Sequence, residues 1–323
     1  MTSPPWNMKK MAEELHIGSW QDSALDQCQP RGENNRKKSE RDSFKLRPRV
    51  QLGVLSGYTD VDQSANPQSF VQHLDRANTY PDLQKAKERL RDLLNPKKDD
   101  HILDVGCGLG LDSYALAEIV GKTGLVVGLD SSATMIREAR RRAELSEASL
   151  EFHVGDAHAL DFPDGSFDSC FVASTLMHVK DPAKVLTELA RVLKPGGRLV
   201  ALECDWETLV ISAENRSLER KVMALLRGAI RNPGIGHQLP VLFHALRLHE
   251  IGVGAGTLTV FDYVVADQLW RIQENMTQAV RAGALTGKAA RNLTKELRAV
   301  SYAGRFFAAT TSFAVSGTKP RTL

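Results

Sequence analysis

The sequence predicts an α/β protein whose central β-sheet is mostly parallel and is covered by helices on both faces. Two observations carry this prediction. Between residues 101 and 204, short apolar runs alternate with longer amphipathic stretches, as strands alternate with helices in right-handed β-α-β units. A cluster of glycines also falls directly after the first apolar run and before the amphipathic stretch that follows it. This position is typical of a ligand-binding turn at the carboxyl end of a parallel strand.

The individual elements follow in a regular order. Two helices come first, opened by Pro67 and Pro81, and Asn95-Pro96 ends the second. Strands are expected at residues 101–105, 125–130, 150–154, 167–173 and 199–204. Helices between them are expected at residues 111–120, from Ser131 or Ser132 to about 145, and from Asp181-Pro182 to 193.

The C-terminal third has a different pattern. Helices are expected near residues 214–231, 238–249, 266–282 and 288–302. Two β-rich runs, 257–265 and 306–316, lie between or after them. These two runs can complete the sheet as its last two strands.

Length and composition exclude several classes of protein. The chain has 323 residues, of which 25% are charged and 42% hydrophobic, as in ordinary globular proteins. It is not collagen-like, coiled-coil or wholly disordered. No run of about 18 apolar residues predicts a transmembrane helix, and the first residues lack the apolar stretch of a secretory signal. We therefore expect a cytoplasmic protein.

The basic excess lies at the beginning of the chain. Residues 1–50 hold ten Lys or Arg and seven Asp or Glu, and the rest holds equal numbers of each sign. A neutral body gives no footprint for nucleic acid. Residues 1–50 are polar and lack periodicity, which predicts a poorly ordered extension.

The four cysteines predict no metal site. Cys28, Cys107, Cys170 and Cys204 form no Cys-x-x-Cys pair and have no zinc-type spacing with histidine. We expect Cys170 and Cys204 to be buried thiols, since they lie in strand-like runs.

The glycine-rich turn is the sharpest motif. Gly106, Gly108 and Gly110 follow the strand 101–105 directly. Glycines without a Cβ let a ligand approach the backbone closely. The pattern by itself is shared by several nucleotide-binding folds, including those that bind NAD.

Acidic residues at the ends of successive strands indicate which kind of nucleotide-like ligand the turn binds. Asp104 precedes the first glycine, where a carboxylate would face a pyrophosphate but suits a ligand that carries an ammonium group. Asp130 ends the second strand and can accept the two hydroxyls of a ribose. Asp156-Ala157 follows the third strand and can hold an adenine edge, and residues 174–178 follow the fourth.

These features together resemble the class I S-adenosylmethionine-dependent methyltransferases. The resemblance rests on residues 103–110, 127–131, 155–157, 167–168 and 193–199. The resemblance is specific over residues 80–205. Within the class, the chain is most similar to the small-molecule branch, which includes quinone-biosynthesis and natural-product enzymes. The resemblance implies a Rossmann-like sheet of seven strands with an antiparallel last strand, and extra helices that cover the active site.

The resemblance also implies a domain organisation. Residues 51–323 would form one methyltransferase domain, with a cofactor-binding core at 80–205. Helical, substrate-covering insertions would follow at 206–305, and the last strand and tail at 306–323. The segment that holds Tyr58, Phe70 and His73 would close over the cofactor.

S-adenosylmethionine is the cofactor that the resemblance implies. The residues that correspond to its binding site are Asp104, Gly106, Cys107, Gly108, Gly110, Asp130, Ser131, Met135, Asp156, Ala157 and Ser174.

The acceptor side is less defined. His178, just past the fourth strand, is the candidate general base, because an imidazole titrates near neutral pH; it can equally be a packing residue. Glu203, Asp205 and Trp206 end the fifth strand and can contact the substrate, or can cap the next segment and close the core. His237 and Gln238 lie on a predicted helix that can roof the site, without the spacing of a metal pair.

Three functions remain open from the sequence. The first is methyl transfer to an O, N or C atom of a small molecule, either a secondary metabolite or a quinone-like ring. The second is NAD-dependent oxidation or reduction, against which Asp104 argues. The third is cofactor binding without turnover.

Overall fold

The computed structural model describes residues 56–144, 148–213 and 215–321. All of them belong to one compact unit. The expected N-terminal extension, residues 1–50, lies outside the described residues.

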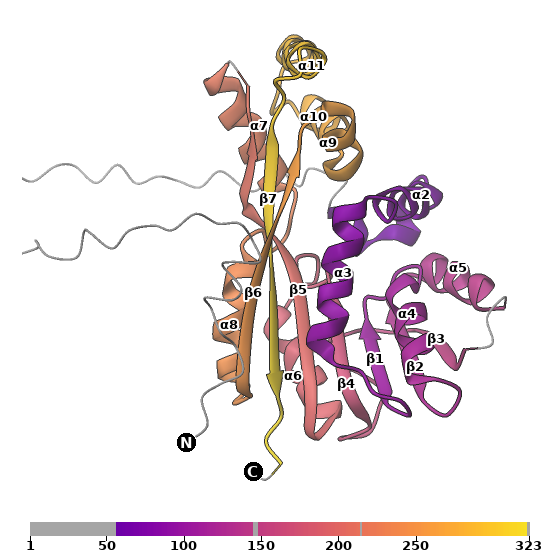
Figure 1. Ribbon diagram of the computed structural model, residues 1–323. Helices are drawn as coiled ribbons and strands as arrows, with labels where there is room; N and C mark the ends of the chain where they lie inside the picture. The colour runs from indigo at the N-terminus through magenta and orange to yellow at the C-terminus, as the bar shows by residue number, and fades with distance from the viewer. Residues whose placement is uncertain (1–55, 145–147, 214, 322–323) are drawn as a thin grey trace, which may run out of the picture. The chain divides into compact units, whose positions relative to one another are not determined.

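A single seven-stranded sheet organises this unit (Figure 1). Its strands are β1 (His101–Val105), β2 (Leu125–Asp130), β3 (Leu150–Val154), β4 (Phe167–Ala173), β5 (Leu193–Ile211), β6 (His249–Val260) and β7 (Ala308–Thr318). The strand order is β3-β2-β1-β4-β5-β7-β6, and β7 is antiparallel to both of its neighbours. The predicted fold class, a mostly parallel sheet with an antiparallel last strand, is confirmed.

Helices surround this sheet. They are α2 (Gln68–Ala77), α3 (Pro81–Leu94), α4 (Leu111–Val120), α5 (Ala133–Ala143), α6 (Pro182–Val192), α7 (Arg216–Gly228), α8 (Ile235–Ala245), α9 (Tyr263–Trp270), α10 (Ile272–Arg281) and α11 (Gly287–Tyr302). Two short 3₁₀ helices, η1 (Ser56–Thr59) and η2 (Val61–Gln63), precede α2.

The expected helix caps are present. The Ser132 side chain accepts a hydrogen bond from the backbone N–H of Met135, so Ser132 rather than Ser131 begins α5. Asp181 accepts one from the N–H of Lys184 at the start of α6, with Pro182 in the first helical position. Such caps satisfy N–H groups that have no partner inside the helix.

The core lies on both faces of the sheet because alternate residues of a strand point to opposite sides. Ile102 of β1 belongs to a buried cluster with residues of α3 and α4, including Leu90 and Leu116. Its neighbour Leu103 belongs to a second, larger cluster with residues of α6, including Leu186. Both faces of β1 are therefore covered, and the strand is held rigidly beneath the glycine-rich turn.

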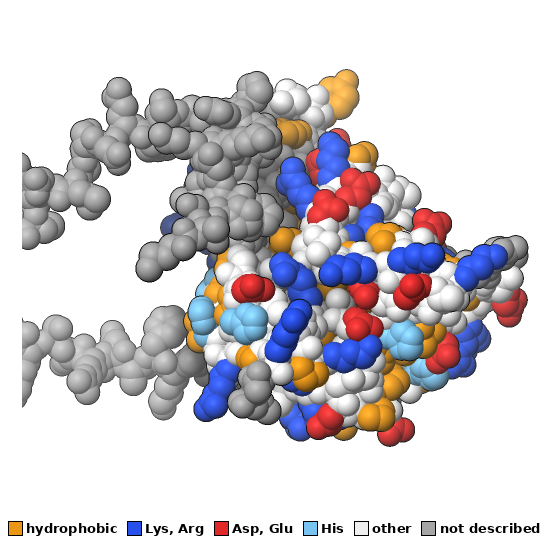
Figure 2. Space-filling model, turned by 60° about the horizontal axis from the view of Figure 1, so that its bottom comes forward, with side chains coloured by type: hydrophobic (Ala, Val, Ile, Leu, Met, Phe, Trp, Pro, Cys, Tyr) orange, Lys and Arg blue, Asp and Glu red, His pale blue; other side chains and the backbone are white. Residues whose placement is uncertain are grey.

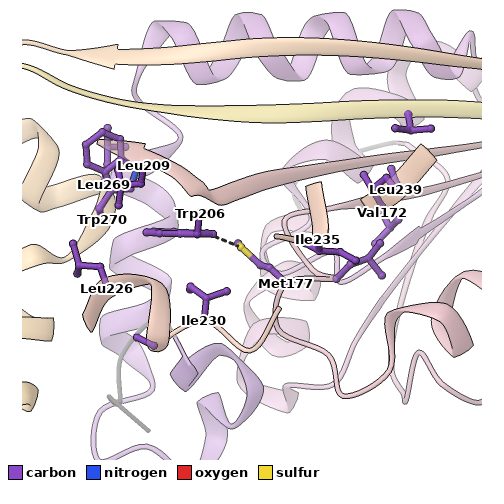
Figure 3. Packing of buried hydrophobic residues seen from close by; sticks show 14 of the residues in the cluster. Val172, Met177, Trp206, Leu209, Leu226, Ile230, Ile235, Leu239, Leu269 and Trp270 are labelled. Carbon is purple, nitrogen blue, oxygen red and sulfur yellow. Dashed lines mark hydrogen bonds between the residues drawn. The ribbon is translucent and has the colours of Figure 1, made fainter. Parts of the chain in front are cut away.

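The carboxyl ends of the parallel strands carry a second layer of helices. In Figure 1 α7, α9, α10 and α11 lie above this edge of the sheet, beside α2. The long strands β5 and β7 extend into them. Figure 3 shows Trp206 at this junction, packed among apolar side chains of α7, α8 and α9. The helices thus share one core with the sheet.

Several boundaries differ from the sequence-based expectation. Strand β5, expected at residues 199–204, extends from Leu193 to Ile211, and the helix expected at 238–249 is α8, Ile235–Ala245. Strand β6 begins at His249 and ends at Val260, eight residues earlier at its start than expected. The β-branched Val264 and Val265 belong to α9, because the Asp262 side chain accepts hydrogen bonds from their two N–H groups and caps a helix there. The single helix expected at 266–282 is interrupted at Arg271, whose backbone is left-handed, with φ 49°.

The surface shows charges of both signs. Figure 2 shows Lys and Arg side chains interspersed with Asp and Glu on the visible face, without a broad region of one sign. In the described part of the chain, no helix combines the length and the apolar character that a membrane span needs.

Candidate active site

The glycine-rich turn has the backbone that its sequence predicted. Gly106, Gly108 and Gly110 have φ values of 73°, 53° and 73°, which favour glycine. A Cβ on Gly106 would collide with the side chain of Thr175, and one on Gly110 would lie 2.5 Å from Phe152. The close approach of neighbouring side chains therefore requires glycine at both positions.

Asp130 ties this turn to the next element. Its carboxylate accepts one hydrogen bond from the N–H of Gly108 and one from the N–H of Ser132, both at 2.9 Å. Burial raises the pKa of Asp130. The carboxyl end of β2 is thus joined to the glycine turn and to the start of α5, in the position expected for a ribose-binding acid.

Asp104 lies beneath the turn and is almost completely buried. Its Oδ2 accepts a 2.6 Å hydrogen bond from the Ser113 hydroxyl. Burial, with a contribution from the nearby Asp112 carboxylate, raises the pKa of Asp104 to about 7. A buried carboxyl group with a raised pKa has a strong preference for a cationic partner.

The other cofactor candidates line the same end of the sheet. Met135 is buried, whereas Ser131 is exposed on the surface. Asp156 follows β3 and accepts hydrogen bonds from the backbone N–H and from Nδ1 of His158, at 2.9 and 2.6 Å. These bonds lower the pKa of Asp156. Ala157 beside it and Cys107 are half-buried, and burial raises the pKa of the Cys107 thiol.

The segment before α3 covers the turn. Phe70 and Val71 of α2 pack with Leu109 and Met135 in a small buried cluster. A Cβ on Gly108 would meet Leu74 of α2 at 3.3 Å. The α2 helix thus packs against the glycine turn, and closure of this segment over the cofactor stays a prediction.

Asp62 of η2 is a contact that the sequence analysis missed. Its carboxylate accepts hydrogen bonds from the Ser132 hydroxyl and from the N–H groups of Ala133 and Thr134. It fastens η2 to the N-terminus of α5, where a negative charge is favourable. A single aspartate in a polar segment gave no sequence signal for this role.

The loop after β4 is held by Glu203. Its buried carboxylate accepts hydrogen bonds from the backbone N–H groups of Thr175, Leu176 and Met177, at 2.9, 2.7 and 3.3 Å. Burial raises the pKa of Glu203 to about 7. The loop begins at Ser174, which is exposed and has a φ of 51°. Glu203 thus fixes the backbone that presents His178.

His178 is buried at the end of this loop. Its Nδ1 has no hydrogen-bond partner, and its ring lies 5.4 Å from the ring of Tyr58. Burial, with a contribution from the Arg231 cation, lowers the pKa of His178 to about 4. The imidazole is therefore neutral near pH 7 and has a nitrogen free for another partner.

Tyr58 and His73 form a chain beside His178. His73 Nε2 lies 3.3 Å from the carbonyl oxygen of Leu269, which can only accept, so the proton of His73 is on Nε2. Its Nδ1 then accepts the hydroxyl proton of Tyr58, at 2.6 Å. Burial, then the Arg271 cation, lowers the pKa of His73 to about 4, and burial raises the pKa of Tyr58.

Asp205 and Trp206 lie within β5, where its pairing with β7 becomes irregular, and they make structural contacts. The buried Asp205 accepts hydrogen bonds from the N–H of Glu207 and from the N–H and Nδ1 of His237. Trp206 Nε1 donates to the sulfur of Met177 at 3.1 Å (Figure 3). The role of Glu203, Asp205 and Trp206 in substrate binding stays a prediction.

The helix that holds His237 and Gln238 lies differently from our expectation. Instead of forming a roof, α8 packs along β5, β6 and β7. Only its first turn reaches the carboxyl edge, where His237 is bonded to Asp205 and Gln238 is exposed. A substrate role for these two residues also stays a prediction. Among residues 56–321 that are described, no group of three His, Cys, Asp or Glu side chains is arranged to hold a metal ion.

The residues fit S-adenosylmethionine. The glycine turn lies at the carboxyl end of β1, where the N–H of Gly108 is bonded to the ribose candidate Asp130 and the buried Asp104 lies beneath it. Asp104 suits the ammonium group of the methionine part of the cofactor. The strand order and this site define a class I S-adenosylmethionine-dependent methyltransferase.

Comparisons with known proteins agree with this class. Residues 96–281 match a family model described as a methyltransferase domain. An uncharacterized 37.1 kDa protein in transposon TN4556 of Streptomyces fradiae is 38% identical over 265 residues, which are 82% of this chain and 74% of that protein. The demethylmenaquinone methyltransferase of Bacillus licheniformis is 38% identical over 146 residues, 45% of this chain and 58% of that enzyme. The chain therefore spans little more than half the length of that relative.

A solved structure supports the fold. The YcgJ protein from Bacillus subtilis superposes with a TM-score of 0.52 at 20% identity, over 73% of this chain and 99% of that protein. The chain belongs to the methyltransferase domain family. It is an S-adenosylmethionine-dependent methyltransferase.

Proposed function

We propose that this enzyme transfers the methyl group of S-adenosylmethionine to an O, N or C nucleophile of a small organic molecule, a secondary metabolite. The helices above the carboxyl edge support this proposal, because α7, α9, α10 and α11 cover the region past β4 and β5 (Figure 1). A covered site suits a small acceptor better than a nucleic acid or a folded protein. A cytoplasmic location remains a prediction from the sequence.

Different residues of this chain would bind different parts of the cofactor. The glycine turn and Asp130 would hold the adenosine part of the cofactor, and Asp104 would lie toward its ammonium group. When bound, the cofactor supplies a methyl group made electrophilic by a positively charged sulfur. The remaining task of the protein is to align an acceptor atom with that methyl group and to exclude water, which can lower a barrier by ~7–11 kcal/mol in favourable cases.

The observation that carries the proposal is the buried, unpartnered Nδ1 of His178. A neutral imidazole can accept a proton, and His178 lies on the loop that Glu203 holds at the carboxyl end of β4. With its pKa at about 4, His178 is a weak base toward an uncharged phenol or alcohol. It would therefore take the proton as the new bond to the methyl carbon forms, when the acceptor becomes much more acidic.

Methylation of a quinone ring is the second candidate. It is favoured by the relatives, since demethylmenaquinone methyltransferases align with 35–39% identity over about half of this chain. In this case the acceptor is a ring carbon activated by a neighbouring hydroxyl group, and His178 would receive a proton from the ring or that hydroxyl.

Methyl transfer from cofactor labelled in its methyl group tests the proposal. The full chain would be incubated with phenols, alkyl amines and a reduced demethylated naphthoquinone, and the label would be followed into the organic products. We expect transfer to one of these classes, with release of S-adenosylhomocysteine, and a slower turnover for His178→Gln at unchanged cofactor affinity. Tight binding of S-adenosylhomocysteine without transfer to any acceptor would instead support a cofactor-binding protein without turnover.

A further inference from the structure

The guanidinium group of Arg271 has an unusual environment. Only 10% of this side chain is exposed. Nε and Nη2 donate to the same oxygen of Glu274, at 2.7 and 2.6 Å, whereas Nη1 is buried without any hydrogen-bond partner. Burying two N–H donors without an acceptor costs free energy, so such a group calls for a partner.

The backbone holds this side chain in place. Arg271 is the single residue between α9 and α10, and its φ of 49° is uncommon for a residue other than glycine. Its N–H donates to the carbonyl of Asp267, and its own carbonyl accepts from the N–H and the side-chain amide of Asn275. The strained residue is thus bonded on both sides, and strain of this kind is often found at functional sites.

Arg271 lies beside an aromatic pair that contacts His178. Its Cζ lies 5.2 Å from the ring centre of Phe70, a residue of the cluster that covers the glycine turn. The Phe70 ring lies 4.9 Å from the ring of Tyr58, which in turn contacts His178. Its positive charge also acts on Tyr58 and His73, so the guanidinium lies close to both.

The other polar groups at this place leave few donors free. The Tyr58 hydroxyl proton is donated to His73, and the His73 proton to the carbonyl of Leu269. The buried side-chain atoms without a partner here are Arg271 Nη1, His178 Nδ1 and the Asn275 Oδ1 that follows Arg271 on α10; of these, only the two N–H of Arg271 Nη1 carry a positive charge. Arg231 adds a further positive charge near His178.

We propose that Arg271 Nη1 binds an anionic oxygen of the methyl acceptor, either a carboxylate or a deprotonated ring hydroxyl, and that Arg271 thereby selects acceptors that carry a single negative charge. This inference rests on the proposed function. Glu274 already neutralises the outward side of the guanidinium, so the remaining face matches a monoanion better than a phosphate. The buried guanidinium would hold one end of the acceptor while its nucleophilic atom faces the methyl group.

Matched pairs of acids and amides test this assignment by binding rather than by turnover. The full chain, saturated with S-adenosylhomocysteine, would be titrated calorimetrically with 4-hydroxybenzoate, 1-hydroxy-2-naphthoate, 1-naphthol and the amides of the two acids. A charge-assisted hydrogen bond corresponds to roughly 10- to 100-fold in affinity. If Arg271 binds a carboxylate, we expect each acid to bind roughly 10- to 100-fold more tightly than its amide. If it binds a ring oxygen, we expect naphthol to bind more tightly as its hydroxyl ionises with rising pH.

Two substitutions and a control complete the experiment. Arg271→Met should abolish the preference for the anion, and Arg271→Lys should keep part of it, with S-adenosylhomocysteine affinity unchanged within about twofold in both. Arg281→Met is the matched control, because Arg281 is exposed at the end of α10, the helix that Arg271 precedes; it should keep the full preference. Unfolding temperatures of the variants would show that they are folded.

The inference is overturned if no anion in the series binds saturably, if acid and amide bind equally and the affinity for naphthol does not rise with pH, or if Arg271→Met retains the preference. These outcomes are distinct from a failure of the proposed function. Methyl transfer to neutral acceptors alone would leave the enzyme a small-molecule methyltransferase and remove the role of Arg271. Absence of S-adenosylhomocysteine binding would remove both.

Discussion

Replacement of Glu203 is a sharp perturbation of the candidate site. This carboxylate is fully buried and accepts the N–H groups of three successive residues, 175–177, which precede His178. Glu203→Leu has a similar volume and removes every acceptor atom. Glu203→Gln keeps the shape and one acceptor oxygen, but its amide nitrogen would face an N–H group. The two variants therefore remove different numbers of hydrogen bonds from one loop.

The magnitudes follow from the number of donors left without a partner. Each buried N–H without an acceptor costs ~1–3 kcal/mol. Glu203→Leu leaves three such groups, so we expect a loss of at least about 3 kcal/mol in the free energy of unfolding, even if the loop moves partly toward water. Glu203→Gln leaves one, the N–H of Met177, whose bond of 3.3 Å is the longest of the three. Its expected loss is about 1 kcal/mol.

Urea unfolding measured by far-UV circular dichroism gives both values. Turnover should also fall in Glu203→Leu even at temperatures where the protein is folded, since His178 loses its fixed backbone, while the affinity for S-adenosylhomocysteine should change little. If both variants unfold within 0.5 kcal/mol of the wild type, the three hydrogen bonds do not hold the loop, and our account of how His178 is positioned is wrong.

Three further predictions concern the cofactor and the pH dependence. Asp130→Ala should weaken S-adenosylmethionine binding ~10- to 1000-fold, because two charge-assisted hydrogen bonds to the ribose and the bond to Gly108 are lost. Equilibrium dialysis measures this affinity, with Asp92→Ala, a change at an exposed residue, as the control. An affinity equal to that of the wild type would mean that the ribose is bound elsewhere. Gly108→Val should abolish cofactor binding and leave the circular dichroism spectrum unchanged, because φ is 53° and the new side chain meets Leu74; binding at wild-type strength would reject the assignment of the turn. His178 has its pKa lowered from 6.5 to about 4 in the folded protein, so its contribution to stability is present above pH 6.5 and is lost as the pH falls toward 4. His178→Gln should therefore lose about 2 kcal/mol less stability than the wild type between pH 7 and pH 5, and equal losses in urea unfolding would show that His178 is not kept neutral by burial.

The position and backbone of the glycine-rich turn could be predicted from the sequence because its signals are local. Strand β1, the turn Gly106–Gly110 and helix α4 follow one another directly, and the turn needs backbone angles that favour glycine. The residue types of this segment therefore indicate its conformation. Asp130 could be assigned for the same reason, since the end of β2 is marked by its apolar run. Parallel strands then bring these separate pieces to one edge without further information.

The sequence singled out His178, Tyr58 and His73 but could not predict that they meet, or that Arg271 lies near them, because these contacts join distant segments. Tyr58, His73, His178 and Arg271 come from η1, α2, the loop after β4 and the break between α9 and α10. No periodicity marks such a meeting. The break itself was hidden, because the residues around Arg271 have a continuous helical pattern and the left-handed residue is not a glycine or an asparagine.

Boundaries in the last third show a related limit. Tyr263, Val264 and Val265 favour strands by their side chains, yet they begin a helix. The helix is stabilised there by the Asp262 cap and by the Ser301 hydroxyl, which accepts a hydrogen bond from the N–H of Tyr263. Side-chain hydrogen bonds and tertiary contacts here override the intrinsic preference of three residues.

The central claim is that the carboxyl edge of this sheet binds S-adenosylmethionine rather than a dinucleotide. Isothermal titration of the full chain with S-adenosylhomocysteine and, in a parallel experiment, with NAD tests it most directly. We predict saturable binding of one S-adenosylhomocysteine per chain, lost in Gly108→Val, and no binding of NAD at the same concentrations. Saturable binding of NAD without binding of S-adenosylhomocysteine would contradict the account of the site.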